Sequence, residues 1–335
     1  MLAVMVVLGH SPELIDGDRH REWLTLIFGT ISLGELAVDA FFLLSGYLIV
    51  QSWNAQPSVL HFLLKRVARI YPGFIVATLL CGFIVGPLAS TPADYFRSFD
   101  LLKFFQQMLL LNVPAIPPVF AGTFYPLVNG SLWTISKEFT CYMGVLILGA
   151  SGMFRSRYAW LAVAAACFAT FILMKIFKRP VGDLRLFIFF LNGACFYQFR
   201  AQIRFRPVFF LVAVALVLIG MFSWRGAEMV LATAGAYLLF YLGNIQSAFL
   251  FRFNRLPDVS YGIYLYAWPV QKMLLWHEPG LSSMALFGLA AFVSTVAGVC
   301  SWYLVEKPVL RYRERNFKMR GKARLVAGFR SEPGG

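Results

Sequence analysis

Three ionisable side chains lie in or beside strongly apolar segments of this chain. His10 ends an apolar run that begins at Met1, and Asp39 and Glu138 lie inside two later apolar segments. Ionisable groups at membrane depth are costly and usually functional, and the proton affinity of histidine suits acid–base chemistry near neutral pH. We therefore predict that His10 is a general base, oriented by the carboxylates of Glu138 and Asp39.

Each of these residues also has a purely structural interpretation. His10 can cap the end of a short helix, and Asp39 can cap the helix that contains it. Glu138 can pair with Lys137 or with another buried cation. The sequence leaves these alternatives open.

A basic cluster of Lys65, Arg66 and Arg69 precedes the apolar segment 70–88. Arg66 and Arg69 are three residues apart, so on a helix they share a face and can grip phosphate groups. Placed in a loop before the membrane segment, the same cluster can instead be a cytoplasmic anchor, because such loops are enriched in Lys and Arg.

The composition predicts an all-α, polytopic integral membrane protein whose main partner is the lipid bilayer. Of the 335 residues, 59% are hydrophobic and 14% are charged, whereas soluble domains carry roughly 25% charged residues. The net charge of +14 fits basic cytoplasmic loops better than nucleic-acid binding. The five cysteines lie in apolar stretches without ligand spacing, so we predict no metal site.

Nine apolar segments are long enough, or nearly so, to cross a bilayer. They are 31–51, 70–88, 128–149, 158–174, 186–199, 207–224, 227–244, 259–276 and 281–305. With the run that ends at His10, we expect about ten transmembrane helices. The first is truncated, since ~1.5 Å per residue carries it across only about half of a ~30 Å core. Segment 101–121 is too short and predicts an interfacial or re-entrant element.

The tail after Glu306 carries nine Lys and Arg residues, which predicts that it is cytoplasmic. Ten helices would then place the N-terminus in the cytoplasm as well, and the three ionisable residues at similar depths in the outer half. We assign 1–310 to one membrane domain and 311–335 to a basic cytoplasmic tail.

Six sequence segments occur in the order typical of the integral-membrane acyltransferase 3 family. They are LAVMVVLGH ending at His10, GELAVDAFFLLSGYLI (34–49), KRVARIYP (65–72), NGSLWTISKEFTCY (129–142), SYGIYLYAWPV (260–270) and VEKP (305–308). Together they cover nearly the whole chain, which therefore resembles this family of bacterial surface-polysaccharide and exopolysaccharide O-acyltransferases.

The resemblance implies transfer of an acyl group, acetyl by default, from cytoplasmic acyl-CoA to a hydroxyl of a sugar or surface polysaccharide. It implies a multi-pass enzyme of the bacterial inner membrane, with acyl-CoA as donor substrate and no permanently bound cofactor. By motif, His10 matches the family's essential histidine, which serves as base or transient acyl carrier. Arg66 and Arg69 match its RxxR pair, placed to hold the CoA phosphates, with Lys65 beside them.

The matched segments hold a further candidate catalytic residue, Glu138, and the aromatic residues expected to bind the acceptor. Glu138 matches the glutamate of the family's W-[ST]-[LI]-x-x-E segment, which begins here at Trp133. We expect Trp133, Tyr264 and Trp268 to bind the acceptor, because an aromatic set suits a sugar-binding cavity. The same side chains also suit helix packing, and the sequence does not separate the two.

Two departures from the family pattern matter. Many members carry a basic residue eleven positions before the histidine, which here would precede Met1, so we expect that the true beginning is missing. Ala267 stands where many members have a histidine, which argues against a two-histidine mechanism. A non-enzymatic transporter or flippase and an inactive subunit of a polysaccharide-export machine stay open as alternatives.

Overall fold

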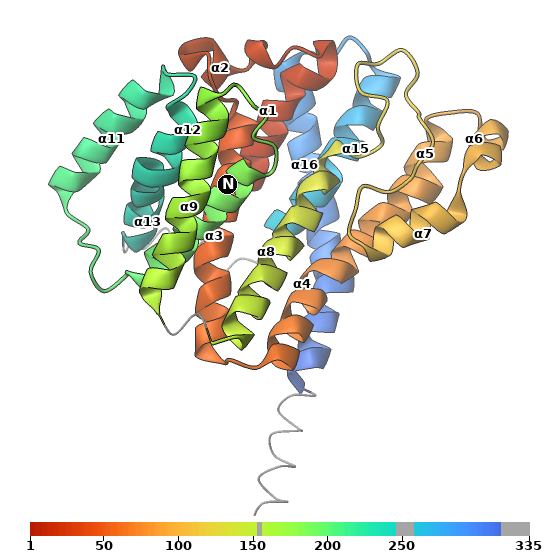
Figure 1. The fold of residues 1–335 in the computed structure, drawn as a ribbon. Helices are drawn as coiled ribbons and strands as arrows, with labels where there is room; N and C mark the ends of the chain where they lie inside the picture. Colours follow the sequence, from red (N-terminus) through yellow and green to blue (C-terminus); the bar gives the residue numbers. More distant parts are fainter. Residues whose placement is uncertain (153–155, 246–257, 316–335) are drawn as a thin grey trace, which may run out of the picture.

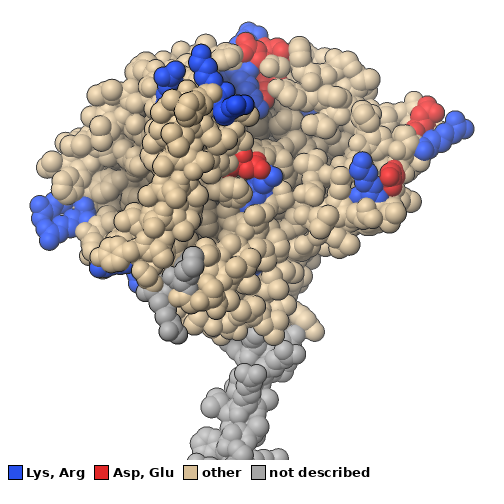
Figure 2. All heavy atoms as spheres, in the orientation of Figure 1, with Lys and Arg blue, Asp and Glu red and all other residues tan. Residues whose placement is uncertain are grey.

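The chain folds as a bundle of helices. The computed structural model describes residues 1–152, 156–245 and 258–315, and all regular elements among them are helical, which confirms the all-α prediction. Figure 1 shows long helices lying roughly side by side, with short helices at the top and at one edge. Uncharged residues cover most of the face drawn in Figure 2. Many large apolar side chains are exposed as well, among them Leu102, Ile147, Ile219 and Leu304, and extensive exposed apolar surface is typical of contact with a membrane.

Four of the described helices are long and apolar enough to cross a membrane. They are α3 (Leu33–Ala55), the helix Val59–Leu88 that begins as α4 (Val59–Leu80), α9 (Arg157–Ile176), and the helix Ser283–Arg315 that begins as α16 (Ser283–Ser301). Shorter apolar helices accompany them. The chain is a multi-pass membrane protein, as its composition predicts.

The other predicted apolar segments are helical too. They form α8 (Trp133–Ala150), α10 (Leu184–Gln198), α11 (Pro207–Met221), α15 (Ser260–His277) and, over 227–244, the successive helices α12 (Ala227–Val230), Leu231–Gly235 and α13 (Ala236–Asn244). The middle piece of the last group is a π-helical turn. Of the predicted basic tail, residues 316–335 lie outside the described part of the chain.

The predicted interfacial segment 101–121 begins with a short helix, α7 (Leu101–Leu109), and continues without regular structure. In Figure 1, α7 projects at one edge of the bundle together with α6 (Pro92–Ser98). Phe104 and Met108 are buried on one side of α7, whereas Leu102 and Leu109 are exposed on the other. The helix therefore packs against the bundle along one face only.

The basic cluster lies on a helix rather than in the predicted loop. α4 begins at Val59, so Lys65, Arg66 and Arg69 occupy its second and third turns. The stretch from Val59 to Arg69 contains neither glycine nor proline, and its long side chains suit a helix. The loop prediction was wrong because lysine and arginine stems pack along apolar surface while their charged ends reach water.

The first helix also extends further than predicted. α1 (Leu2–Asp16) continues past His10 and ends at Gly17, whose φ is 75° and whose N–H donates to Glu13 O. Pro12 lies inside α1. One turn earlier, the carbonyl of Val7 accepts from Ser11 Oγ at 2.8 Å and from Gln271 Nε2 of α15 at 2.9 Å. His10 therefore lies within a helix that is tied to α15.

α3 and α10 approach each other at two glycines. A Cβ atom added to Gly193 would lie 1.9 Å from the carbonyl oxygen of Leu43, and one added to Gly46 would lie 1.9 Å from that of Phe190. Such approaches are typical of membrane helices, which associate through close packing because lipid supplies no hydrophobic drive. This contact positions α3, which carries part of the site described below.

We expect Gly193→Ala to destabilise the protein, because the added methyl group must push two backbones apart. Overpacking of this kind typically costs ~1–3 kcal/mol, seen as a lower unfolding temperature of the purified protein in detergent. Gly288→Ala on α16 is the matched control, because a Cβ there meets nothing within 4 Å. Equal melting temperatures for the two variants would contradict the close approach.

Candidate active site

His10 lies beside a carboxylate and an aromatic ring. Its Nδ1 is 3.3 Å from Oε2 of Glu13, and the two side chains are 21% and 5% exposed. The ring of Trp268, from α15, meets the imidazole edge-on with 4.9 Å between the ring centroids. Nε2 of His10 has no hydrogen-bond partner among the described residues. The ring is thus held through Nδ1, and its Nε2 is left without a hydrogen bond.

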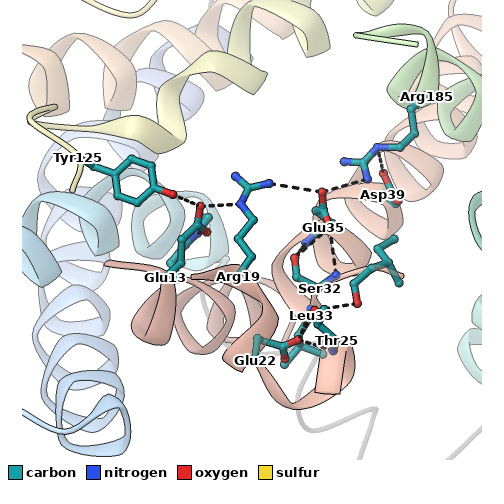
Figure 3. A network of polar contacts seen from close by, with 12 residues as sticks. Glu13, Arg19, Glu22, Thr25, Ser32, Leu33, Glu35, Asp39, Tyr125 and Arg185 are labelled. Carbon is teal, nitrogen blue, oxygen red and sulfur yellow. Dashed lines mark hydrogen bonds and ion pairs between the residues drawn. The ribbon is translucent and has the colours of Figure 1, made fainter. Parts of the chain in front are cut away.

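Glu13 is the centre of this arrangement. Its Oε1 accepts from Arg19 Nε at 2.7 Å and from the Tyr125 hydroxyl at 2.9 Å, as Figure 3 shows. Burial by itself lowers the pKa of Arg19, but the attraction and hydrogen bond of the Glu13 carboxylate outweigh the effect of burial, so the pKa of Arg19 is raised. Burial and the hydrogen bond to Glu13 raise the pKa of Tyr125. Both partners therefore keep their protons, and they stabilise Glu13 as a carboxylate.

A chain of ion pairs continues from Arg19 toward α10. Arg19 Nη1 lies 3.6 Å from Glu35 Oε1, and Arg185 Nη1 lies 3.6 Å from the same oxygen. Arg185 Nε is 3.5 Å from Asp39 Oδ1. Figure 3 shows the alternating charges in sequence, from Glu13 to Asp39. Among the described residues, the contacts that connect the fully buried Asp39 to His10 run through Arg185, Glu35, Arg19 and Glu13.

The carboxylate in contact with His10 is therefore neither of the two predicted. Asp39 faces Arg185, and Glu138 accepts from Ser45 Oγ at 3.2 Å and from the Tyr142 hydroxyl. Sequence reasoning missed Glu13 because it follows the apolar run rather than lying inside one. The usable signal was its spacing of three residues from His10, which puts both on one face of a helix.

Glu138 and the two arginines line the same cavity. This cavity of about 330 Å³ lies between α3, α4, α8 and α15. Its wall includes Arg66 and Arg69 from α4, Ser45 from α3, and Glu138 from α8. The structure thus joins four of the predicted site residues, Arg66, Arg69, Glu138 and Tyr264, into one space, away from the contacts of His10.

The two arginines differ in what they bind. Arg69 pairs with Asp258 (Nη2 to Oδ2, 2.5 Å) and with the buried Glu306 (Nη1 to Oε2, 3.2 Å). Arg66 and Lys65 instead donate to the neutral Ser52 hydroxyl, at 3.3 and 3.2 Å. Arg69 is paired with two carboxylates, whereas Arg66 makes no ion pair within the described part of the chain.

The predicted aromatic residues occupy three different environments. Trp268 contacts His10 and is 5% exposed. The Tyr264 hydroxyl lies 2.6 Å from Thr134 Oγ1 and donates to the Ser131 carbonyl at 2.8 Å, in the cavity wall. Trp133 is 41% exposed at the start of α8. They do not form a single aromatic surface.

Comparison with known proteins identifies the family to which the chain is similar. The chain matches the acyltransferase domain family Acyl_transf_3 over residues 1–304. It is 26% identical over 328 residues to the O-acetyl transferase of Shigella phage Sf6, covering 92% of this chain and 94% of that protein. It is 26% identical over 330 residues to the exopolysaccharide production protein ExoZ of Rhizobium meliloti (strain 1021), covering 88% and 93%. Nodulation protein 10 of Rhizobium leguminosarum bv. viciae is 25% identical over 311 residues, covering 82% of each chain. No solved structure gives a significant match.

The Arg69–Glu306 pair predicts strong energetic coupling. Glu306→Gln removes the buried carboxylate of the pair, while Arg69 is 27% exposed and keeps Asp258, so we expect a loss smaller than the ~3–5 kcal/mol that is typical of breaking a fully buried pair. We expect the Arg69→Gln, Glu306→Gln double variant to be less destabilised than the two single effects summed. A double-mutant cycle on thermal unfolding measures this coupling. Strictly additive effects would contradict the pairing.

Proposed function

The chain belongs to the acyltransferase family Acyl_transf_3, and we propose that it transfers an acetyl group from acetyl-CoA to a hydroxyl of a cell-surface polysaccharide. Family membership makes it an acyltransferase, so a non-enzymatic transporter is not supported. The name of the phage relative supports acetyl as the group transferred, and that of the ExoZ protein supports a polysaccharide acceptor. We place the enzyme in the bacterial inner membrane, with the end that carries Arg66 and the C-terminal tail in the cytoplasm.

The observation that carries the mechanism is the Glu13–His10 contact. With Nδ1–H donated to Glu13, Nε2 of His10 keeps its lone pair and takes the proton of the acceptor hydroxyl. The hydroxyl oxygen attacks the thioester carbon, and the carbon–sulfur bond breaks as the new ester forms. The imidazolium returns its proton to the departing CoA thiolate. Glu13 orients the ring and stabilises the imidazolium.

We assign Glu138 to the donor side of the reaction. It shares the cavity with Arg66 and Arg69. We propose this cavity as the route by which the donor enters from the cytoplasm. Ser45 and Tyr142 hold its carboxylate in the wall. Asp39 lies at the end of the ion-pair chain and acts as a positioning residue through Arg185 and Glu35.

The aromatic residues receive separate proposed roles. Trp268 lies against His10 and is the aromatic surface closest to the reacting atoms. Tyr264 lines the donor cavity. Trp133, more exposed at the start of α8, is available to an acceptor sugar that approaches from outside the bundle.

We expect His10→Ala to abolish acetylation, because a positioned general base contributes ~10²–10⁴-fold. Glu13→Gln keeps the shape of the side chain but removes its charge, and should slow the reaction by at least ~10-fold. The measurement is mass spectrometry of surface glycans from cells that express each variant at equal levels. His20→Ala is the control, because His20 is an exposed histidine of the same region and should retain full acetylation. Full acetylation with His10→Ala protein inserted normally in the membrane would overturn the proposed mechanism.

A further inference from the structure

Lys272 is buried in the bundle without a carboxylate partner among the described residues. It lies on α15, one helical turn after Trp268, and it is 1% exposed. Its Nζ donates to the Thr123 hydroxyl at 2.6 Å and lies 4.9 Å from the centre of the Phe120 ring. A buried charge in a membrane protein is costly and usually functional. Neither the wall of the donor cavity nor the contacts of His10 include this lysine.

Both partners of Lys272 belong to one turn of the chain. The segment 110–129 joins α7 to the helical turn Gly130–Leu132 without regular structure, and it runs beside α15 in Figure 1. Within it, the Phe120 carbonyl accepts from Thr123 Oγ1 at 2.9 Å and from the Thr123 N–H at 3.1 Å. These bonds close a tight turn from Phe120 to Thr123, which carries both groups that Lys272 contacts.

This turn is strained, and α15 holds it in place. Phe120 has a φ of 58°, a left-handed conformation that is uncommon for residues other than glycine. Such a conformation persists only where the surroundings fix it. The Phe120 side chain is fully buried, and Trp276 of α15 meets its ring edge-on, with 5.7 Å between the centroids. The Lys272 ammonium lies over the same ring, which is a favourable contact for a cation held away from water.

The turn leads directly to a residue that contacts Glu13. Tyr125 follows Thr123 by two residues, and its hydroxyl donates to Glu13 Oε1 at 2.9 Å, as Figure 3 shows. The Tyr125 ring also lies edge-on to Trp268, with 5.9 Å between the centroids. The other oxygen of Glu13 lies 3.3 Å from His10 Nδ1. A displacement of the turn would therefore move a hydrogen-bond donor of the carboxylate that contacts His10.

We propose that Lys272 is a positioning residue for the acyl transfer. By holding the turn Phe120–Thr123 against α15, it places the Tyr125 hydroxyl on Glu13 and thereby fixes the carboxylate that orients His10. The inference rests on the proposed function, because it takes His10 as the base. Lys272 acts through Tyr125 and Glu13 rather than on the reacting atoms. Such placement has a large effect on rate, since a shift of ~1 Å can cost ~10²-fold.

The first test observes His10 without requiring acetylation. The chain holds four histidines, so ¹⁵N-histidine labelling of the purified protein in phosphatidylcholine nanodiscs gives four imidazole rings to follow by NMR. We expect Lys272→Met and Tyr125→Phe to shift the His10 ring nitrogens in the same direction. The double variant should shift them no further than Tyr125→Phe alone. His61, on α4, is the internal reference and should not move.

The second test measures the reaction. In cells with equal amounts of each variant in the membrane, Lys272→Met should lower the rate at which surface glycans are acetylated by about 10-fold, as followed by mass spectrometry. In the Tyr125→Phe background the same substitution should have no further effect. If Lys272→Met protein does not accumulate, Thr123→Val decides the question, because it removes the acceptor hydroxyl and keeps the lysine. Thr170→Val is the matched control, since Thr170 is exposed on α9 and donates only within that helix.

The two measurements separate the inference from its premise. If Lys272→Met leaves the His10 nitrogens unmoved, or if its effect on acetylation multiplies with that of Tyr125→Phe, Lys272 does not act through Tyr125 and the inference is refuted. If the nitrogens shift as expected but His10→Ala protein acetylates fully, the proposed function fails. The role of Lys272 in the transfer fails with it, although its connection to His10 is then confirmed.

Discussion

The interior of this bundle depends on the pairing of buried carboxylates with arginines from other parts of the chain. Glu13, Asp39 and Glu306 are at most 5% exposed, and an unpaired charge in such a place would be severely destabilising. Each is met by one arginine, from the segment after α1, from α10 and from α4 respectively. Since lipid gives apolar helices little reason to associate, these pairs and the glycine contacts determine which helix faces which.

The same pairing separates the two ends of the proposed reaction path. In the last turn of α1, Glu13 uses its two oxygens for His10, Arg19 and Tyr125. On α4, Arg69 is paired with Glu306 and Asp258, whereas Arg66 has no ion pair among the residues that the structure describes.

Much of the fold follows from the sequence, since apolar segments of suitable length form helices at nearly the predicted places. The errors came where polar residues interrupt the pattern. Lys65 to Arg69 belong to α4 and not to a loop, and α1 continues through Pro12 to Asp16. Lys65, Arg66 and Arg69 were expected to precede a helix, and the residues after His10 were expected to follow one. In both places the backbone is helical. The charge of a side chain does not decide whether its backbone is helical, because a long stem can pack on apolar surface while its charged end reaches water.

The sequence by itself determined that the chain lies in a membrane, where most of its helices are and to which family it belongs. Hydropathy and the order of motifs are properties that can be read along the chain without knowing its contacts. It also identified His10, Glu138, Arg66 and Arg69 as residues to examine. Only the tertiary structure decided which of them meet: Glu13 and not Glu138 contacts His10, and Glu306 binds Arg69 but not Arg66. Depth along a helix can be counted from residue number, but rotation about its axis is set by contacts with other helices. Contacts between ionisable groups depend on that rotation.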